Sequence, residues 1–273
     1  MDLKLAINFA QLVNAAYAIS PTDLTNRQGQ TITVNGTDYV VVTSVYANDL
    51  ATDINALRAQ QTVSIGFVLQ VKGAQDVVIA IRGTEGIMEW IQDAKFAQVP
   101  CPFLKSAGNT EDGFTDMYGS LRIGAGVGSQ KLISALPSLA YPTGVGPATP
   151  VTICGHSLGG AIATLLVLDV AANSPFKSTT AYTYASPRVG DSTFVTAYNH
   201  LVPDTYRIAN RLDLVPKLPL PPLYDHVLGL YEVNPGLQVK LTVACEHVLN
   251  TYLYLLSQAS GGTAIPLDPG CKA

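Results

Sequence analysis

Apolar positions follow two different periods along the chain. Near the N-terminus they recur at the spacing of one helical face, which predicts an amphipathic first helix. The residues on this face are Leu5, Phe9, Leu12, Val13 and Ala16. Farther on, short runs rich in β-branched side chains predict strands. These predicted strands are 37–46, 62–71, 76–81, 150–154, 179–185 and 205–209.

Helical periodicity returns between most of these runs. The predicted helices are 87–96, 114–136 with an interruption near Gly124–Gly128, 161–168, 192–200 and 247–258. Two further runs, 227–233 and 237–243, predict a hairpin turned at 234–236. Because strands alternate with helices, we expect an α/β fold with a mostly parallel central sheet covered by helices on both faces. We find no linker, so residues 1–273 are predicted to form a single domain.

Composition narrows the possible partners. The net charge of −4 and the few charged residues, 13% of the chain, argue against nucleic acid, which requires a basic face. No apolar run reaches the ~20 residues that span a bilayer, so stable membrane insertion is not expected. Asn8, Gln11 and Asn14 interrupt residues 1–18, which argues against a signal peptide. The chain is then either cytoplasmic or, as we favour, the mature form of a secreted protein.

The four cysteines lack the paired spacings of a zinc site. We expect neither a metal nor an organic cofactor. Cys154 lies in a predicted strand, where it would act as a small buried residue. The other three allow one disulfide, and we favour Cys245–Cys271 because both lie near the C-terminal end.

The most informative motif is Gly155-His156-Ser157-Leu158-Gly159, between the predicted strand 150–154 and helix 161–168. A serine between strand and helix, flanked by glycines, is typical of the nucleophile elbow of α/β-hydrolases. Glycines allow the strand and helix to approach closely. The alternative is a glycine-rich helix start with a capping serine. The strand–turn–helix setting favours Ser157 as a nucleophile.

A serine nucleophile needs a base, and the base needs an orienting carboxylate, in the chain order nucleophile, acid, histidine. We favour His247, between the last predicted strand and helix, over His226 in the proline-rich loop. Asp213, which follows the strand 205–209, is the favoured acid. The remaining histidines and acids are expected to pack, cap helices or face solvent. They are His156, His200, Asp191, Asp204, Asp225 and Glu246.

The oxyanion of an ester intermediate needs hydrogen-bond donors. One should be the backbone amide of Leu158, the residue after the nucleophile. Another should come from the loop after an earlier strand, and Arg82-Gly83-Thr84 has the right position. Taken alone, this tripeptide could equally be an ordinary turn.

Together these motifs resemble the class 3 lipases, the filamentous-fungal lipase family, from about Val77 to Leu256. The matching segments are 79–84, 90–93, 112–114 with Tyr118, 155–159, 184–190, 210–216 with 218–219, and 246–248. The resemblance implies an α/β-hydrolase fold with Ser157 as nucleophile, Asp213 as acid and His247 as base. It also implies an oxyanion hole formed by Thr84 and Leu158.

The family places a lid helix after the Arg-Gly-Ser/Thr motif, which here implies a lid at about 85–96. Helical spacing puts apolar residues on one face of this segment, where they could cover the serine and bind acyl chains. These residues are Ile87, Met88, Trp90 and Ile91.

The chain departs from the family in three ways. Asp112 stands where the family usually has His, the interval from Asp213 to His247 is short, and the first ~60 residues carry no familiar motif. The short interval keeps His226 open as the base.

The resemblance implies a triacylglycerol lipase that hydrolyses acylglycerol esters at a lipid–water interface. A short-chain or feruloyl esterase, or a phospholipase cutting the sn-1 ester, is the alternative within enzymes. A lipase-like binding protein without turnover is the alternative outside them.

Overall fold

The computed structural model describes residues 1–49, 61–83 and 96–273. Several predicted site residues fall outside these ranges, and so does the predicted lid apart from Phe96. The residues outside are Thr84, Ile87, Met88, Trp90 and Ile91.

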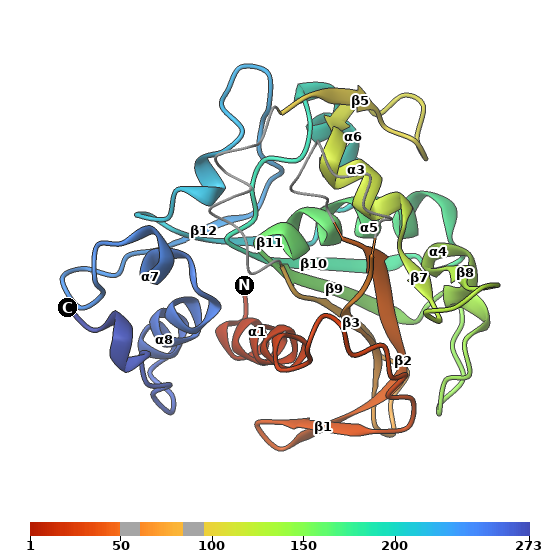
Figure 1. The fold of residues 1–273 in the computed structure, drawn as a ribbon, viewed down its shortest axis with the longest axis horizontal. Coiled ribbons are helices and arrows are strands. Elements are labelled where there is room, and N and C mark those ends of the chain that lie inside the picture. Colours follow the sequence, from red (N-terminus) through yellow and green to blue (C-terminus); the bar gives the residue numbers. More distant parts are fainter. Residues whose placement is uncertain (50–60, 84–95) are drawn as a thin grey trace.

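In the described part of the chain, ten strands form one twisted sheet in the order β12-β11-β10-β9-β4-β3-β2-β7-β8, with β1 paired to β2 (Figure 1). Its strands are β1 (Thr31–Val34), β2 (Thr37–Asn48), β3 (Thr62–Val71), β4 (Val77–Ile81), β7 (Arg122–Ile123), β8 (Gln130–Lys131), β9 (Pro150–His156), β10 (Ser178–Tyr184), β11 (Thr205–Asn210) and β12 (Leu230–Val233). The central strands β4, β9, β10, β11 and β12 are parallel, as predicted, and β1, β2, β3, β7 and β8 extend the sheet antiparallel. Strands β5 (Gln98–Pro100) and β6 (Asn109–Glu111) pair separately.

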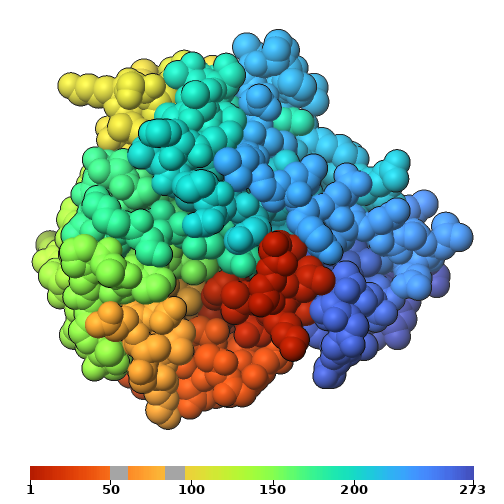
Figure 2. All heavy atoms as spheres, turned by 180° about the vertical axis from the view of Figure 1, so that it is seen from behind, coloured from red at the N-terminus to blue at the C-terminus, as the bar shows by residue number. Residues whose placement is uncertain are grey.

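Helices cover both faces of the sheet. One face carries α1 (Leu3–Tyr17) and α8 (Leu249–Ser260), which pack on each other, so the first and last long helices lie side by side. Figure 2 shows the N-terminal segment, in red, against the C-terminal segment, in blue. Within the described ranges, the other helices and helical turns are α3 (Asp112–Gly119), α4 (Leu132–Ala135), α5 (Leu158–Asn173), α6 (Ser192–Leu201), α7 (Val243–His247), η1 (Leu136–Ser138), η2 (Val215–Lys217) and η3 (Pro269–Cys271).

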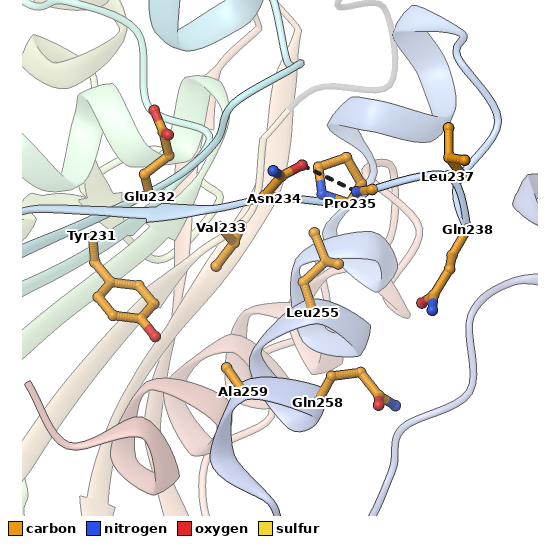
Figure 3. Close-up of a pocket in the computed structure, with 11 residues that line it drawn as sticks. Tyr231, Glu232, Val233, Asn234, Pro235, Leu237, Gln238, Leu255, Gln258 and Ala259 are labelled. Atoms are coloured by element: carbon orange, nitrogen blue, oxygen red, sulfur yellow. Dashed lines mark hydrogen bonds between the residues drawn. The ribbon is translucent and has the colours of Figure 1, made fainter.

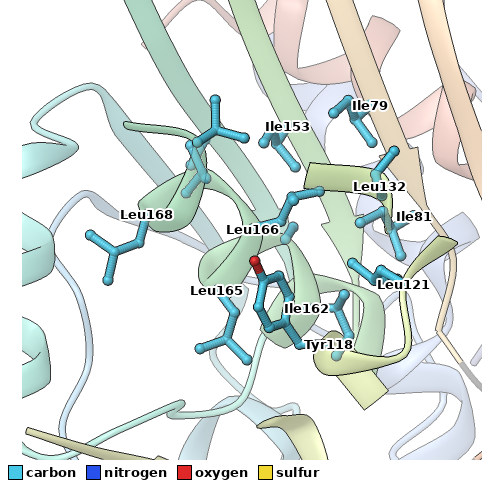
Figure 4. Packing of buried hydrophobic residues seen from close by; sticks show 14 of the residues in the cluster. Ile79, Ile81, Tyr118, Leu121, Leu132, Ile153, Ile162, Leu165, Leu166 and Leu168 are labelled. Carbon is cyan, nitrogen blue, oxygen red and sulfur yellow. The ribbon is translucent and has the colours of Figure 1, made fainter. Parts of the chain in front are cut away.

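Helix α5 forms the centre of the opposite layer. It is buried on all sides between the sheet, α3 and α6, so Leu165, Leu166 and Leu168 are fully buried in one cluster with Ile79 and Ile153 of the sheet (Figure 4). Burial of each such side chain stabilises the fold by roughly 1.5–3 kcal/mol. The helix that begins beside Ser157 is therefore firmly held.

The predicted helix over 114–136 is wrong. Helix α3 ends at Gly119, and β7 and β8 form a short antiparallel hairpin at the sheet edge before α4 begins. Gly124 and Gly128 in the hairpin loop have positive φ angles of 77° and 88°. Such angles favour glycine and end a helix, so the glycines mark a turn rather than an interruption.

The predicted hairpin over 227–243 is also wrong. Strand β12 pairs parallel with β11 and extends the sheet, while Val239 forms an isolated bridge with Lys272 in the C-terminal tail. The last helical stretch is divided as well. Thr242 caps α7 by accepting a hydrogen bond from the Cys245 amide, and the extended Val248 (ψ 137°) separates α7 from α8.

The C-terminal tail is joined to α7 by a disulfide between Cys245 and Cys271. Cys101 and Cys154 are free and buried. Among the residues that the structure describes, no helix is long and apolar enough to span a membrane.

Candidate active site

Ser157 occupies a sharp turn between β9 and α5, as the motif predicts. Its backbone angles, φ 58° and ψ −128°, are strained for any residue with a side chain. The flanking glycines are required by close backbone contacts. A Cβ on Gly155 would lie 2.1 Å from the Gly159 carbonyl oxygen, and one on Gly159 would lie 2.5 Å from the Ile81 carbonyl oxygen. The turn thus holds the serine close to β4.

The structure brings Ser157, His247 and Asp213 together. Nε2 of His247 lies 2.8 Å from Oγ of Ser157, and Nδ1 of His247 lies 2.8 Å from Oδ2 of Asp213. Ser157 and Asp213 are fully buried, and His247 is 5% exposed. The histidine can therefore accept the serine proton through one nitrogen while the other donates to the carboxylate.

Further donors fix the Asp213 carboxylate. The Tyr252 hydroxyl on α8 donates to Oδ2 at 2.7 Å, and the Val215 amide donates to Oδ1 at 2.9 Å. The same hydroxyl accepts from the Asn210 amide at 3.0 Å. Burial, with the nearby Asp213 charge, raises the pKa of Tyr252 well above its usual value, so the hydroxyl stays protonated as a donor.

A second hydrogen-bonded series runs behind His247. Nε2 of His156 donates to the His247 carbonyl at 2.8 Å, so Nδ1 of His156 accepts from the Tyr17 hydroxyl, also at 2.8 Å. The Tyr17 oxygen in turn accepts from the Gly83 amide at 2.9 Å. Burial, with His247 nearby, lowers the pKa of His156 well below its usual value. His156 is thus a neutral structural link, not a second base.

Glu246 differs from its predicted solvated position, because its side chain is only 4% exposed. The Asn210 side-chain amide donates to Oε2 at 2.7 Å and to the Glu246 carbonyl at 2.8 Å. Burial raises the pKa of the Glu246 carboxyl, and the Asp213 charge adds to this shift. The protonated form of Glu246 is therefore favoured relative to that of a glutamate in water.

His226 contacts neither Ser157 nor Asp213 among the hydrogen bonds of the described residues. Its Nε2 donates to the Pro216 carbonyl at 2.6 Å, and burial, with Arg207 nearby, lowers its pKa to about 3. Asp191 caps α6 as expected, accepting from the Phe194 amide at 2.8 Å. His200 is exposed.

The positions of the predicted oxyanion donors are described in part. Leu158 is the first residue of α5, and the first amides of a helix have no acceptor within it. Thr84 lies outside the described residues, but the preceding Gly83 borders the serine. A Cβ on Gly83 would lie 3.0 Å from Cβ of Ser157. Gly83, which follows β4, thus lies directly beside Ser157.

Sequence reasoning missed Tyr17, Tyr252 and Asn210 as partners of the site. Buried tyrosine hydroxyls need hydrogen-bond partners, but the sequence does not say which tyrosine of thirteen reaches which partner. Asn210 had a signal, since it begins the segment that contains Asp213.

A surface groove of about 500 Å³ lies elsewhere, between the end of β12, the following turn and α8 (Figure 3). Leu255, Gln258 and Leu237 are among its lining residues, and none of the three site residues is. The groove is open and partly polar. Because none of the three site residues lines it, it is separate from the site around Ser157.

The sequence matches one family of known proteins and several individual relatives. The sequence profile described as Lipase (class 3) matches residues 78–222. A chloroplastic phospholipase A1-Igamma1 of Arabidopsis thaliana is 30% identical over 231 residues, which cover 69% of this chain and 44% of the relative. A secreted mono- and diacylglycerol lipase 1 of Fusarium solani is 28% identical, over 81% of this chain and 62% of the relative. The chain spans about half the length of the plant phospholipase relatives that it matches.

Solved structures share the fold. A mutant form of MDLA from Penicillium cyclopium superposes with a TM-score of 0.66 at 22% identity, covering 89% of this chain and 84% of that one. The Rhizomucor miehei lipase propeptide complex gives 0.55 at 24% identity, with 85% and 66% covered. At these identities the likeness establishes an α/β-hydrolase fold.

Proposed function

The chain belongs to the class 3 lipases, and we therefore propose that it is a serine hydrolase of lipid carboxylic esters, most specifically of acylglycerols. One observation carries the proposal: Ser157, His247 and Asp213 form a continuous hydrogen-bonded series at a strained strand–helix turn. A serine that served only as a helix cap would need neither the histidine nor the buried carboxylate.

In the proposed mechanism, Ser157 Oγ attacks the ester carbonyl carbon while His247 Nε2 takes the hydroxyl proton. Asp213 holds the histidine and stabilises its charged form. The Leu158 amide, together with Thr84, donates to the oxyanion. His247 then protonates the leaving alcohol, and an acyl-enzyme forms on Ser157. Water, deprotonated by His247, attacks the acyl carbon and releases the fatty acid and the free serine.

The roles are tested with soluble p-nitrophenyl esters. Ser157→Ala and His247→Ala should each lower kcat by roughly 10⁴-fold or more, because members of such a series act as a unit. His226→Ala is the matched control and should retain turnover, as His226 binds the Pro216 carbonyl instead. If His226→Ala alone were inactive, the base would be wrongly assigned.

Binding without turnover is the rival outside enzymes. A fluorophosphonate probe reacts covalently only with an activated serine, so it should label the native chain and leave Ser157→Ala unlabelled. An unlabelled native chain would favour a binding protein.

Relatives favour a second substrate class, because several are named phospholipase A1. Their name supports cleavage of an sn-1 phospholipid ester as the alternative reaction. Parallel assays on triacylglycerol, diacylglycerol and diacyl phosphatidylglycerol separate the two, since an acylglycerol lipase should turn over the neutral lipids faster. A higher kcat/KM on the phospholipid would reverse the assignment.

We also propose that the chain is secreted. Structural disulfides persist in oxidising compartments, and one relative is named as a secreted lipase. Mass spectrometry of the protein from its native source under non-reducing conditions should find Cys245 and Cys271 paired. Recovery only inside cells with both thiols free would contradict secretion.

A further inference from the structure

The loop that follows β11, residues 211–223, carries a concentration of exposed leucines. Of the exposed large hydrophobic side chains in the described part of the chain, four belong to this loop. They are Leu212 (37% exposed), Leu214 (46%), Leu220 (66%) and Leu223 (67%). Single exposed leucines are ordinary, but their concentration in one loop indicates an interaction surface.

The loop is fixed to the body of the protein. The Arg188 amide donates to the Leu218 carbonyl at 2.7 Å, and the Arg188 guanidinium donates to the Pro219 carbonyl at 2.9 Å. At the far end, the Gln98 side chain donates to the Leu223 carbonyl at 2.6 Å. Figure 1 shows the loop, in light blue, projecting beside β5. Because its backbone is held by these bonds, the loop presents its leucines in a fixed arrangement.

Cations accompany the leucines. Arg211 and Lys217 are exposed, whereas Asp213, the only acidic residue between positions 211 and 223, is fully buried and bonded to His247. The next acidic side chain along the chain is the exposed Asp225. The exposed charged side chains of this loop are therefore both positive, on a protein whose net charge is −4.

This surface borders the proposed catalytic residues. Leu212 and Leu214 flank Asp213 on either side, and Val248, 37% exposed, follows His247 directly. A lipid layer in contact with the loop would thus lie next to the segments that carry the acid and the base.

We propose that the 211–223 loop docks the protein on an anionic phospholipid surface. Leu220 and Leu223 enter the boundary between headgroups and acyl chains, while Arg211 and Lys217 approach lipid phosphates. The inference rests on the proposed lipid-ester hydrolysis, which it deepens by naming the surface on which the substrate is met. It uses only residues outside the predicted lid.

The test is sedimentation of the Ser157→Ala protein with sucrose-loaded vesicles, which separates binding from turnover. Vesicles of phosphatidylcholine alone are compared with vesicles that contain about 30% phosphatidylglycerol, whose anionic headgroups create a negative surface potential. Binding should be stronger to the anionic vesicles. Arg211→Gln/Lys217→Gln should weaken it there by about ten-fold or more, with little effect on neutral vesicles. Leu220→Ser/Leu223→Ser should weaken binding to both by about ten-fold or more.

A matched control is Leu237→Ser/Leu241→Ser. Leu237 is 90% and Leu241 74% exposed, Leu241 follows Lys240 directly, and both belong to the segment between β12 and α7 rather than to the 211–223 loop. This pair should bind vesicles as the parent does, and circular dichroism should show all variants folded. Equal binding by the loop variants and the parent, or equal losses in loop and control pairs, would overturn the inference.

Failure here and failure of the proposed function are distinguishable. Hydrolysis of soluble esters by the native chain with no vesicle preference would leave the proposed function intact and remove the docking surface. Vesicle binding by a chain that the fluorophosphonate probe does not label would support the docking surface and contradict the proposed function.

Discussion

The Tyr17 hydroxyl lies 2.8 Å from Nδ1 of His156, a residue 139 positions later in the chain. Through this contact the first helix reaches the turn that carries Ser157. The same oxygen accepts from the Gly83 amide, and His156 donates to the His247 carbonyl. One side chain of α1 thus links the backbone on three sides of the serine.

We expect Tyr17→Phe to lower both activity and stability. It leaves Nδ1 of His156 and the buried Gly83 amide without their partner, at about 1–3 kcal/mol for an unsatisfied buried group. Turnover of p-nitrophenyl butyrate should fall about ten-fold, and urea denaturation should show the lost free energy of unfolding.

Tyr206→Phe on β11 is the matched control, since its ring packs on Tyr182 rather than in the site. Equal effects of the two substitutions would mean that the Tyr17 network is dispensable.

Glu246→Gln should stabilise the protein at neutral and higher pH. Folding raises the pKa of this carboxyl, so its contribution is favourable at low pH and is lost as pH rises through the folded pKa. Its Oε1 also has no hydrogen-bond partner among the described residues. The gain in free energy of unfolding should be on the order of 1 kcal/mol at pH 8 and smaller at pH 4.5.

Denaturation of the exposed Glu232→Gln variant at both pH values gives the comparison. A gain for Glu246→Gln that did not depend on pH would argue against ionisation as its cause.

Acid should destabilise the fold through two histidines, the buried His156 and the half-buried His226. The pKa of His226 is lowered to about 3, and that of His156 is also lowered, so the unfolded chain binds protons that the folded chain does not. Stability is therefore complete above the unfolded pKa of about 6.5 and falls below it, by at most about 1.4 kcal/mol per pH unit for each histidine. For His226 the loss continues to about pH 3.

Urea denaturation between pH 8 and 4 measures this slope. His226→Gln should flatten it, whereas the exposed His200→Gln should not. If the free energy of unfolding depended on pH equally in both variants, His226 would not be a cause of the acid destabilisation.

Opening the Cys245–Cys271 disulfide should loosen the segment that carries His247. The bond closes a sequence separation of 26 residues, and chain entropy for such a loop gives about 3.5 kcal/mol. Cys245→Ser/Cys271→Ser should lower the free energy of unfolding by about this amount, and thermal loss of activity should follow it.

Reductant supplies the internal check. Dithiothreitol should destabilise the native chain but leave the double variant unchanged. A native chain insensitive to reductant while its thiols titrate as free would show that the bond contributes little.

Local chemistry explains which parts of this fold were predictable. The elbow was predictable because its serine and glycines stand together between a recognisable strand and helix, and Gly155 is required by the backbone of Gly159 in the same turn. The parallel strands were predictable from continuous β-branched runs. The 114–136 segment failed because an apolar period cannot distinguish a helix from a hairpin that completes a sheet edge. For 227–243, the partner of β12 was the distant β11, which no local pattern reveals.

The site divides in the same way. Motifs in the sequence predicted Ser157, Asp213 and His247, although His247 lies outside the family match over 78–222. Tyr17 and Tyr252 belong to no site motif, and their contacts were not predicted. Burial of Glu246 depends on Asn210, 36 residues earlier, so its immediate neighbours gave no indication. Tertiary hydrogen bonds of this kind need coordinates.

The strained backbone of Ser157 lowers the stability of the fold, although the proposed catalysis needs the hydroxyl at this position. With φ at 58°, a side chain here costs on the order of 1–3 kcal/mol, and glycine does not pay it. Ser157→Gly should therefore unfold at higher urea concentration than Ser157→Ala, although both lack the nucleophile. Equal midpoints would show that the turn carries no strain.

A mutant library of this chain sorted for thermal tolerance alone would accordingly enrich inactive clones at position 157. Directed evolution of a more thermostable catalyst from this chain therefore requires a screen for turnover in every round.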